Sequence, residues 1–357
     1  MTKVLDALET QGSLNFLNEM IFPSPNRHAD IQHIAIPTRM LANYYDLALK
    51  VQKVKRTTIF TMKPTDFRYS PNLYLTKLGH EFMLLIRDIT CNPLITHSRS
   101  SLCLNPIIVE LVQKIIAHRL PYIPITDHVQ YESMIDHCIS DFKVSTTTRD
   151  FQTQLRNWNT RFKSAMYEYD SFMQRIQETT DRFEVHSMVV QRRLKNGQPL
   201  QFDDMGFTDQ SNEEVVMDKA KLIIKAVWRN KRKNKVIGVL SKREINQAGT
   251  DTIRLIFFMR KEYSDWEDFH KTALYSDLSA FFIDHPIDRI ALGHIGSMNA
   301  RIVPLFQQQE LNYYDLNQNY VGERLRHLKA QLVSTDFWIR VRSKQQTIKV
   351  ERSPNAD

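Results

Sequence analysis

The sequence predicts an α+β protein, in which a mainly helical N-terminal region precedes an antiparallel sheet domain. Apolar residues recur every three or four positions before residue 180, which indicates helices. After residue 183 the apolar positions alternate within short segments, which indicates strands. Hydrophobic residues make up 42% of the 357 residues and charged residues 25%, a globular composition that excludes collagen and disordered chains.

The N-terminal part, residues 1–145, is predicted to form a mainly helical domain, with helices at 73–89 and 107–116. The polar run at 145–150 marks either a domain boundary or the start of the next helix, and the second domain is assigned to residues 146–357. A long amphipathic helix is expected at 151–180. Its aromatic stripe is expected to face the core.

The second domain is expected to alternate strands and helices. The Asn196-Gly197 turn and the capping boxes that begin at Ser211 and Ser264 separate the elements. The expected strands are 183–194, 235–245, 250–259 and, more weakly, 289–306. The expected helices are 215–228, 264–283 and 310–333, and a closing hairpin or strand is expected at 337–350.

The order β-α-β-β-α-β predicts a split sandwich, in which helices pack on one face of an antiparallel sheet. RNA-recognition modules and the nicking domains of rolling-circle replication initiators share this arrangement. An RNA-recognition module needs a glycine and several aromatic residues in one central strand. The segment 251–258 has no glycine, and Phe257 and Phe258 are expected on opposite faces, so this match is poor.

The composition favours a polyanionic partner. Lys and Arg number 48 against 40 Asp and Glu, a net charge of +8. Cys91, Cys103 and Cys138 form no C-x-x-C motif, which is typical of a reducing, cytoplasmic compartment. No glycine-rich nucleotide-binding motif occurs, and His128, His137 and Cys138 lack the second cysteine pair of a zinc site, so no cofactor or metal is expected. No long uncharged apolar segment occurs, so no membrane partner is expected.

Basic residues gather in several segments of the second domain, where they are expected either to contact DNA phosphates or to be ordinary solvated charges. Trp338 is expected on the same strand face as its basic neighbours, in a position to stack on an unpaired base. The predicted nucleic-acid-binding residues are Arg192, Arg193, Lys195, Arg229, Lys231, Arg232, Lys233, Lys235, Arg324, Arg326, Lys329, Trp338, Arg340, Arg342 and Lys344.

Several of these segments together resemble the inovirus-type replication protein family, which is also known from prophage proteins with a YagK/YfjJ carboxy-terminal domain. The runs Val236-Ile-Gly-Val-Leu-Ser-Lys-Arg-Glu244 and Arg254-Leu-Ile-Phe-Phe258 follow the order of two family strands joined by a turn. The segments 332–343 and 347–354 are similar to the closing part of the family. The resemblance covers about residues 151–354.

This resemblance implies the chemistry of DNA nicking and joining. In the family, a His-x-His pair and an acidic residue hold a divalent cation, and a tyrosine attacks a DNA phosphate. Glu244 matches the acidic residue, whereas Thr252 and Arg254 occupy the histidine positions. Gln331 lies near the tyrosine position, and Ser334 replaces a lysine. Because an arginine has no lone pair for a metal, Arg254 is expected to form an internal ion pair with Glu244.

The sequence therefore predicts a DNA-binding, replication-initiator-like protein of a bacterial prophage or mobile element that does not nick DNA. Hairpin or single-stranded DNA is the expected partner, and the helical N-terminal region is a candidate for oligomer formation. Two alternatives stay open. One is an active nickase that uses Mg²⁺ or Mn²⁺ and one of Tyr313, Tyr314 and Tyr320. The other is an RNA-binding or scaffold module with the same sandwich.

Overall fold

The computed structural model describes part of the chain in detail and divides it into two compact units. The described residues are 5–6, 9–11, 13–14, 41–54, 60–63, 72–91, 102–122, 128–193, 209–245, 251–262, 271–284, 297–302, 305–306, 309–341 and 348–351. The sheet unit comprises Met1–Ile31, Phe162–Asp336 and Arg340–Asp357, and the helical unit comprises Gln32–Arg161 and Phe337–Ile339. The expected α+β class is confirmed.

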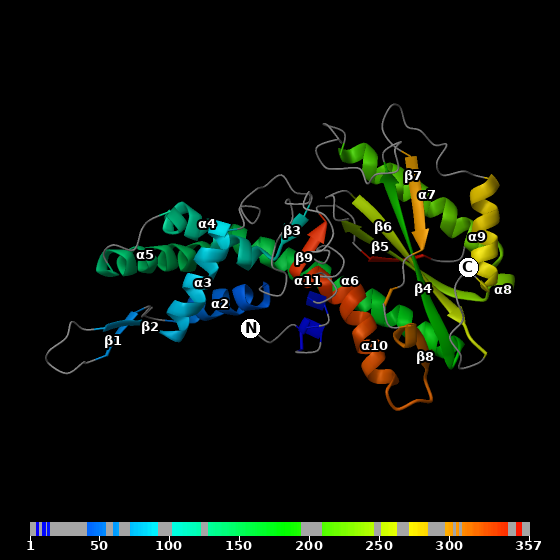
Figure 1. Ribbon diagram of the computed structural model, residues 1–357, viewed down its shortest axis with the longest axis horizontal. Coiled ribbons are helices and arrows are strands. Elements are labelled where there is room, and N and C mark those ends of the chain that lie inside the picture. The colour runs from blue at the N-terminus through cyan, green and yellow to red at the C-terminus, as the bar shows by residue number, and fades with distance from the viewer. Residues whose placement is uncertain are drawn as a thin grey trace. The chain divides into compact units, whose positions relative to one another are not determined.

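The helical unit is built mainly from helices (Figure 1). Helices α2 and α4 each bury an apolar face. Asn105 begins α4 by accepting a hydrogen bond from Ile107 N through its side chain at 3.2 Å, and Pro106 follows in the first turn. The elements are α2 (Leu41–Lys53), β1 (Phe60–Lys63), β2 (Asn72–Leu75), α3 (Lys77–Cys91), β3 (Leu102–Leu104), α4 (Pro106–Ala117), a 3₁₀ turn (Leu120–Tyr122) and α5 (His128–Thr147).

Helix α6 (Arg149–Thr179) is the long amphipathic helix that the sequence predicted at 151–180. It begins directly after α5, so the polar run at 145–150 is where one helix ends and the next begins. The division between the two units falls within α6, between Arg161 and Phe162. The aromatic stripe of α6 is buried, as expected, from Phe151 to Ile176.

The sheet unit contains an antiparallel sheet with the strand order β10-β5-β6-β4-β7, and β8 also pairs with β4. The expected strands at 183–194, 235–245 and 250–259 and the helix at 215–228 are confirmed. The elements are β4 (Arg182–Arg193), α7 (Asp209–Arg229), α8 (Lys231–Asn234), β5 (Val236–Ile245), β6 (Asp251–Arg260), α9 (Ala273–Asp284), β7 (Ser297–Ile302), β8 (Tyr313–Asp315), α10 (Val321–Lys329), a π-helical segment (Ala330–Ser334) and β10 (Ile348–Glu351). The helical turn α11 (Thr335–Trp338) and the short strand β9 (Ile339–Val341) contain Phe337–Ile339, which belong to the helical unit.

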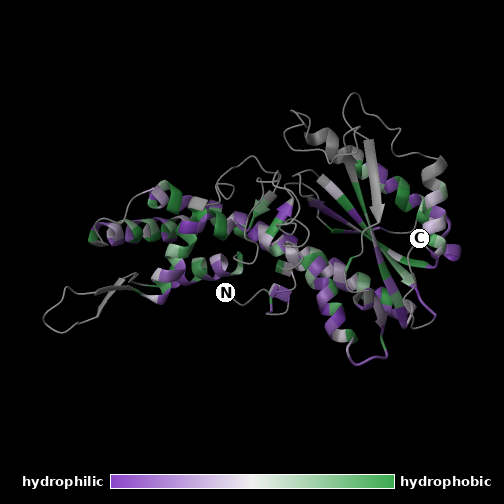
Figure 2. Cartoon of the chain, in the orientation of Figure 1, coloured by the Kyte–Doolittle hydropathy of each residue, from purple (hydrophilic) through white to green (hydrophobic). Residues whose placement is uncertain are grey.

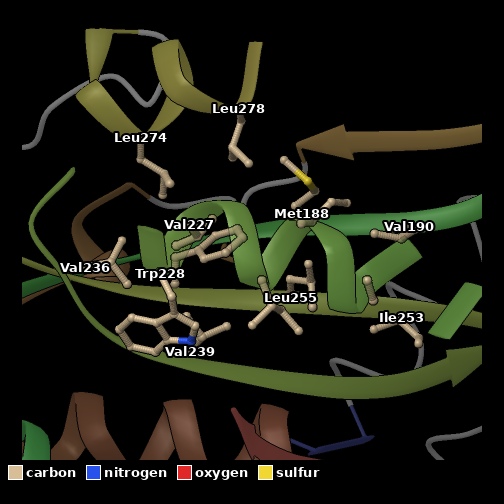
Figure 3. Packing of buried hydrophobic residues seen from close by; sticks show 14 of the residues in the cluster. Met188, Val190, Val227, Trp228, Val236, Val239, Ile253, Leu255, Leu274 and Leu278 are labelled. Atoms are coloured by element: carbon tan, nitrogen blue, oxygen red, sulfur yellow. The ribbon is translucent and has the colours of Figure 1, made fainter. Parts of the chain in front are cut away.

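Helices α7 and α9 cover one face of the sheet. Figure 3 shows Val227 and Trp228 of α7 and Leu274 and Leu278 of α9 packed over the apolar side chains of the strands. The strand residues in this cluster are Met188, Val190, Val236, Val239, Ile253, Leu255, Phe257 and Met259. Removing this apolar surface from water is the main force that holds the two helices on the sheet.

The second face of the sheet is also covered, which differs from the expectation of helices on one face only. Phe172 of α6 contacts the ring of Phe258 on β6 edge-to-face, with centroids 4.9 Å apart. A side chain at Gly238 of β5 would lie within 2.6 Å of both Phe172 and Ile176, so the glycine lets α6 approach the strand closely. The apolar face of α6 therefore packs on this face of β5 and β6, and a flat ligand has no access to it.

The segment predicted as one helix at 310–333 is interrupted by a strand. β8 pairs with the first residues of β4, and β7 pairs with residues 188–193 of the same strand. Two short strands thus pair with the two ends of this edge of the 12-residue β4. The prediction for 310–333 is wrong at this point because edge pairing outweighs local helix propensity.

Candidate functional site

The centre of the second sheet face holds a buried ion pair between β6 and β5. Arg254 is completely buried, and its Nε lies 2.9 and 3.1 Å from the two carboxylate oxygens of Glu244. Its Nη1 donates to Ser187 Oγ at 3.3 Å on the neighbouring strand β4. The ion pair that the sequence predicted is present. A guanidinium therefore occupies the space beside the carboxylate.

Lys242 lies next to this pair and is also buried. Its Nζ donates hydrogen bonds to Gln331 O at 2.9 Å and to Thr335 Oγ1 at 2.6 Å. Burial lowers the pKa of Lys242, the nearby carboxylates of Asp336 and Glu244 raise it, and the charge of Arg254 lowers it, with a net lowering. Through these two hydrogen bonds, Lys242 connects β5 to residues 331–335, which follow α10.

The residues implied by the family resemblance do not fit a divalent cation. Thr252 is buried beside Glu244 in the strand register, and Arg254 offers only donors. Both oxygens of Glu244 already face the Arg254 guanidinium. Among the described residues, no three His, Cys, Asp or Glu side chains gather closely enough to hold a metal ion.

The π-helical segment Ala330–Ser334 carries Gln331 and Ser334, the residues near the family's tyrosine and lysine positions. Both side chains are buried, and Gln331 Oε1 and Ser334 Oγ have no hydrogen-bond partner among the residues that the structure describes. Neither group is a nucleophile of the required kind. The segment instead supplies backbone and hydroxyl acceptors for Lys242.

Two of the three candidate tyrosines are unsuited to attack a phosphate. Tyr313 and Tyr314 belong to β8 and not to a helix, and both are buried. The ring of Tyr314 stacks on Phe183 with centroids 4.7 Å apart, and burial raises the pKa of both hydroxyls. Tyr320 is exposed, in the turn before α10.

The predicted basic run at 229–235 lies at one end of the sheet, where other cations join it. β4 and β5 begin at this end and β6 ends there: Arg260 N donates to Lys235 O at 2.9 Å, and Lys261 N donates to Arg182 O at 3.1 Å. Figure 1 shows α8, the end of β6 and the start of β4 together, and Figure 2 colours α8 hydrophilic. We call this surface the basic end, and it comprises Arg182, Arg229, Lys231, Arg232, Lys233, Lys235, Arg260 and Lys261.

Several of these cations already have acidic partners. Lys233 pairs with Asp277 at 2.9 Å, Lys235 with Glu262 at 3.3 Å, and Arg182 with Asp315 at 3.0 Å. Lys261 is only 11% exposed and pairs with the buried Glu184 at 2.8 Å. Arg229 and Arg232 are exposed, and within the described part of the chain they form no ion pair. These two arginines are therefore the cations most available to a phosphate.

The basic residues predicted on α10 mainly form ion pairs and hydrogen bonds with other residues of the sheet unit. Arg326 forms an ion pair with Asp6, and Lys329 pairs with Asp170 of α6 at 2.9 Å. Arg324 donates to Tyr313 O at 2.9 Å and lies over the ring of Tyr320. These contacts hold α10 in place and leave fewer donors for a ligand.

The expectation that Trp338 and Arg340 form an exposed binding face is wrong. Trp338 ends the helical turn α11, so the alternation of a strand does not apply to it. Its ring is buried in the helical unit against Tyr45 and Phe337, at centroid distances of 5.8 and 4.9 Å. Arg340 is buried and its Nε donates to Asp336 O at 2.8 Å.

The remaining predicted nucleic-acid residues cannot be assigned to a surface. Arg192 and Arg193 end β4, but their side chains lie outside the described set. Lys195, Arg342 and Lys344 lie outside the described residues altogether.

Sequence reasoning missed Arg182, Arg260 and Lys261. Each lies where a strand begins or ends, and a basic residue at a strand end is unremarkable by itself. The signal was the antiparallel order, because the start of one strand lies beside the end of its neighbour. Combining that order with the basic run at 229–235 would have identified the basic end.

No protein-family model matches the chain, and no curated protein or solved structure matches it. Among the described residues, no helix is both long enough and apolar enough to span a bilayer.

Proposed function

We propose that this protein binds DNA through the basic end of the sheet unit and does not cut it. The observation that carries the proposal is the convergence of cations from four separate segments: the start of β4, the end of α7 with α8, the start of β5, and the end of β6. Several cations gathered on one surface attract a polyanion and can contact several phosphates at once.

The order of the strands supports the relationship to replication initiators. The central order β5-β6-β4-β7, with α7 after β4 and α9 after β6, is the one expected for a β-α-β-β-α-β sandwich. The covered second face argues against the RNA-recognition alternative, which needs open aromatic residues on that face. Origin in a prophage or mobile element remains part of the proposal.

The absence of nicking follows from the chemistry of Arg254. A nicking centre of the family's type needs a cation with open coordination positions beside the acidic residue. Arg254 has a fixed positive charge and no lone pair, and it occupies both oxygens of Glu244. The site is therefore stabilised as a structural ion pair.

Binding to labelled hairpin DNA, single-stranded DNA and RNA of matched sequence tests the proposal. For duplex DNA, each lost phosphate contact should lower the slope of log affinity against log salt by about 0.9. The variant Arg229→Gln/Arg232→Gln should therefore bind more weakly and with a smaller slope. Arg156→Gln/Lys163→Gln, which removes the same charge from exposed positions of α6, is the matched control and should bind like the wild type.

Three results would contradict parts of the proposal. Equal losses for both double variants would show that only net charge matters and that the basic end is not the interface. Preference for RNA, or no binding to either nucleic acid, would favour the RNA-binding or scaffold alternative. A covalent protein–DNA adduct on supercoiled plasmid with Mg²⁺ or Mn²⁺ would show that the protein is an active nickase.

A further inference from the structure

Tyr320 is an exposed aromatic residue held in a defined position. It lies in the turn between β8 and α10, and it is 44% exposed. Arg324 Cζ lies 4.2 Å from the centroid of the Tyr320 ring. Arg324 is itself fixed, because its Nη1 donates to Glu310 O and Tyr313 O. One side of the ring is therefore supported, and the exposed remainder faces solvent.

The turn that carries Tyr320 joins the basic end. Leu316 N donates to Asp181 O at 2.8 Å, which attaches the turn to the start of β4. Arg182 links the two parts again, since its Nε donates to Asp315 and its Nη1 donates to Glu262 O after β6. Figure 1 shows β8 at the same end of the sheet as the start of β4.

The sheet end therefore presents different chemistry at its two sides. The β5 and β6 side carries the cations, and the β8 side carries Tyr320 with the exposed amides Asn317, Gln318 and Asn319. Strands β5, β6, β4 and β8 are neighbours in that order, so three strand spacings, about 15 Å, separate β5 from β8; Tyr320 lies five residues beyond β8, and Arg229 and Arg232 lie before β5. A short single strand of nucleic acid spans this distance.

We propose that the basic end and Tyr320 together bind single-stranded DNA, with phosphates on the cations and an unpaired base stacked on the Tyr320 ring. Every base has a π face, so such a contact is tolerant of sequence, and the neighbouring amides are placed to contact base edges. In a duplex the bases are stacked on one another, so Tyr320 has no base to contact. This inference rests on the proposed DNA binding and names its substrate class.

Binding of the full chain to an oligothymidine of about 12 nucleotides, and to a hairpin duplex with a minimal loop, tests the inference. Loss of a stacking ring should weaken single-strand binding, so Tyr320→Leu should bind the oligothymidine about 5-fold to 100-fold less tightly. Its duplex affinity should be unchanged. Tyr320→Phe keeps the ring and should bind both like the wild type.

Tyr167→Leu is the matched control. Tyr167 is 76% exposed on α6, and it lies 12 residues before Thr179, whose carbonyl accepts from Arg260 at the basic end. At 1.5 Å per residue this is about 18 Å away along the helix. The variant should leave both affinities unchanged. Photocrosslinking of the wild-type chain to a bromodeoxyuridine oligonucleotide should label Tyr320, which tests the contact without any substitution.

The outcomes separate this inference from the proposal on which it rests. If the wild type binds DNA but Tyr320→Leu binds the single strand normally and crosslinks form elsewhere, the stacking site is overturned while DNA binding stands. Equal losses for single-stranded and duplex DNA in Tyr320→Leu would also overturn it. If the wild type binds no DNA at about 50 mM salt, where phosphate contacts are strong, both proposals fail.

Discussion

Lys242 and Arg254 lie directly opposite each other on β5 and β6, so two cations face each other inside the protein. Like charges in this position normally destabilise a sheet. The two side chains reach different partners: Arg254 extends diagonally to Glu244, and Lys242 extends to Gln331 O and Thr335. The carboxylates of Glu244 and Asp336 offset the repulsion.

The ion pair should be costly to break but replaceable. Arg254→Met leaves the Glu244 carboxylate without its partner, and it should lower the free energy of unfolding by about 3 to 5 kcal/mol. Arg254→Met/Glu244→Leu removes both charges and should recover most of that loss. Urea unfolding of both variants measures the difference. A double variant as unstable as the single one would show that the pair is not the cause.

Lys242 should make stability depend on alkaline pH. Its pKa is lowered in the folded protein, so the unfolded chain binds more protons between the folded pKa and 10.5. The free energy of unfolding of the wild type should therefore rise with pH in that interval, relative to Lys242→Met, and should level off above 10.5. Urea unfolding across this pH range measures the effect.

The control for this experiment is Lys225→Met, which removes an exposed lysine of α7. Its stability should run parallel to that of the wild type across the same pH range. If the free energy of unfolding of Lys242→Met also runs parallel to that of the wild type, the pKa of Lys242 is not lowered by burial.

Glu184 should have the opposite pH dependence. Burial alone would raise its pKa, but the hydrogen bonds and charges of His186 and Lys261 outweigh burial and lower the pKa from 4.5. The stability that this group contributes is present above 4.5 and is lost as the pH falls through the folded pKa. Glu184→Gln should be less stable than the wild type at neutral pH, and this difference should shrink in acid.

Thermal unfolding of both proteins from neutral pH into acid measures this convergence. Glu178→Gln, an exposed change in α6, is the control and should track the wild type. A constant difference between wild type and Glu184→Gln at all pH values would show that the carboxylate charge is not what stabilises this site.

Gly238 should tolerate no side chain. Gly238→Ala would place Cβ 2.6 Å from side-chain atoms of Phe172 and Ile176, and these buried side chains would have to move. Overpacking of this kind should lower the free energy of unfolding by about 1 to 3 kcal/mol. Gly322→Ala is the control, because nothing lies within 4 Å of its Cβ on α10.

The control should stabilise the protein slightly, since alanine favours a helix over glycine by about 0.5 to 1 kcal/mol. Urea unfolding of the two variants gives opposite signs if α6 packs against β5 as described. A neutral Gly238→Ala would show that this contact is loose.

Local features of the chain were predictable because they depend on residues close in sequence. The apolar spacing of α6 and the alternation of β4, β5 and β6 lie within single elements. The Arg254–Glu244 pair is similar, because a short connection joins β5 to β6 and the partners are only 10 positions apart. Side-chain alternation then places both on one face.

Contacts between distant segments were not predictable in the same way. Trp338 belongs to an alternating run that reads as a strand, yet its neighbour Phe337 accepts a hydrogen bond from Asn105, 232 positions earlier. The covered second face likewise depends on Phe172 of α6 meeting Phe258 of β6. The basic end brings together residues that the sequence separates widely, from Arg182 to Lys261.

The sequence by itself determined the long regular elements, such as α6, β4, β5 and β6, and which of their residues share a face. Only the tertiary structure decided which apolar faces meet, which basic residues are buried, and which reach the surface together. The physical reason is that periodicity is a property of one segment, whereas the removal of apolar surface from water is non-directional. An apolar face gains free energy from contact with any other apolar surface, so only the packing of the whole chain decides which faces meet.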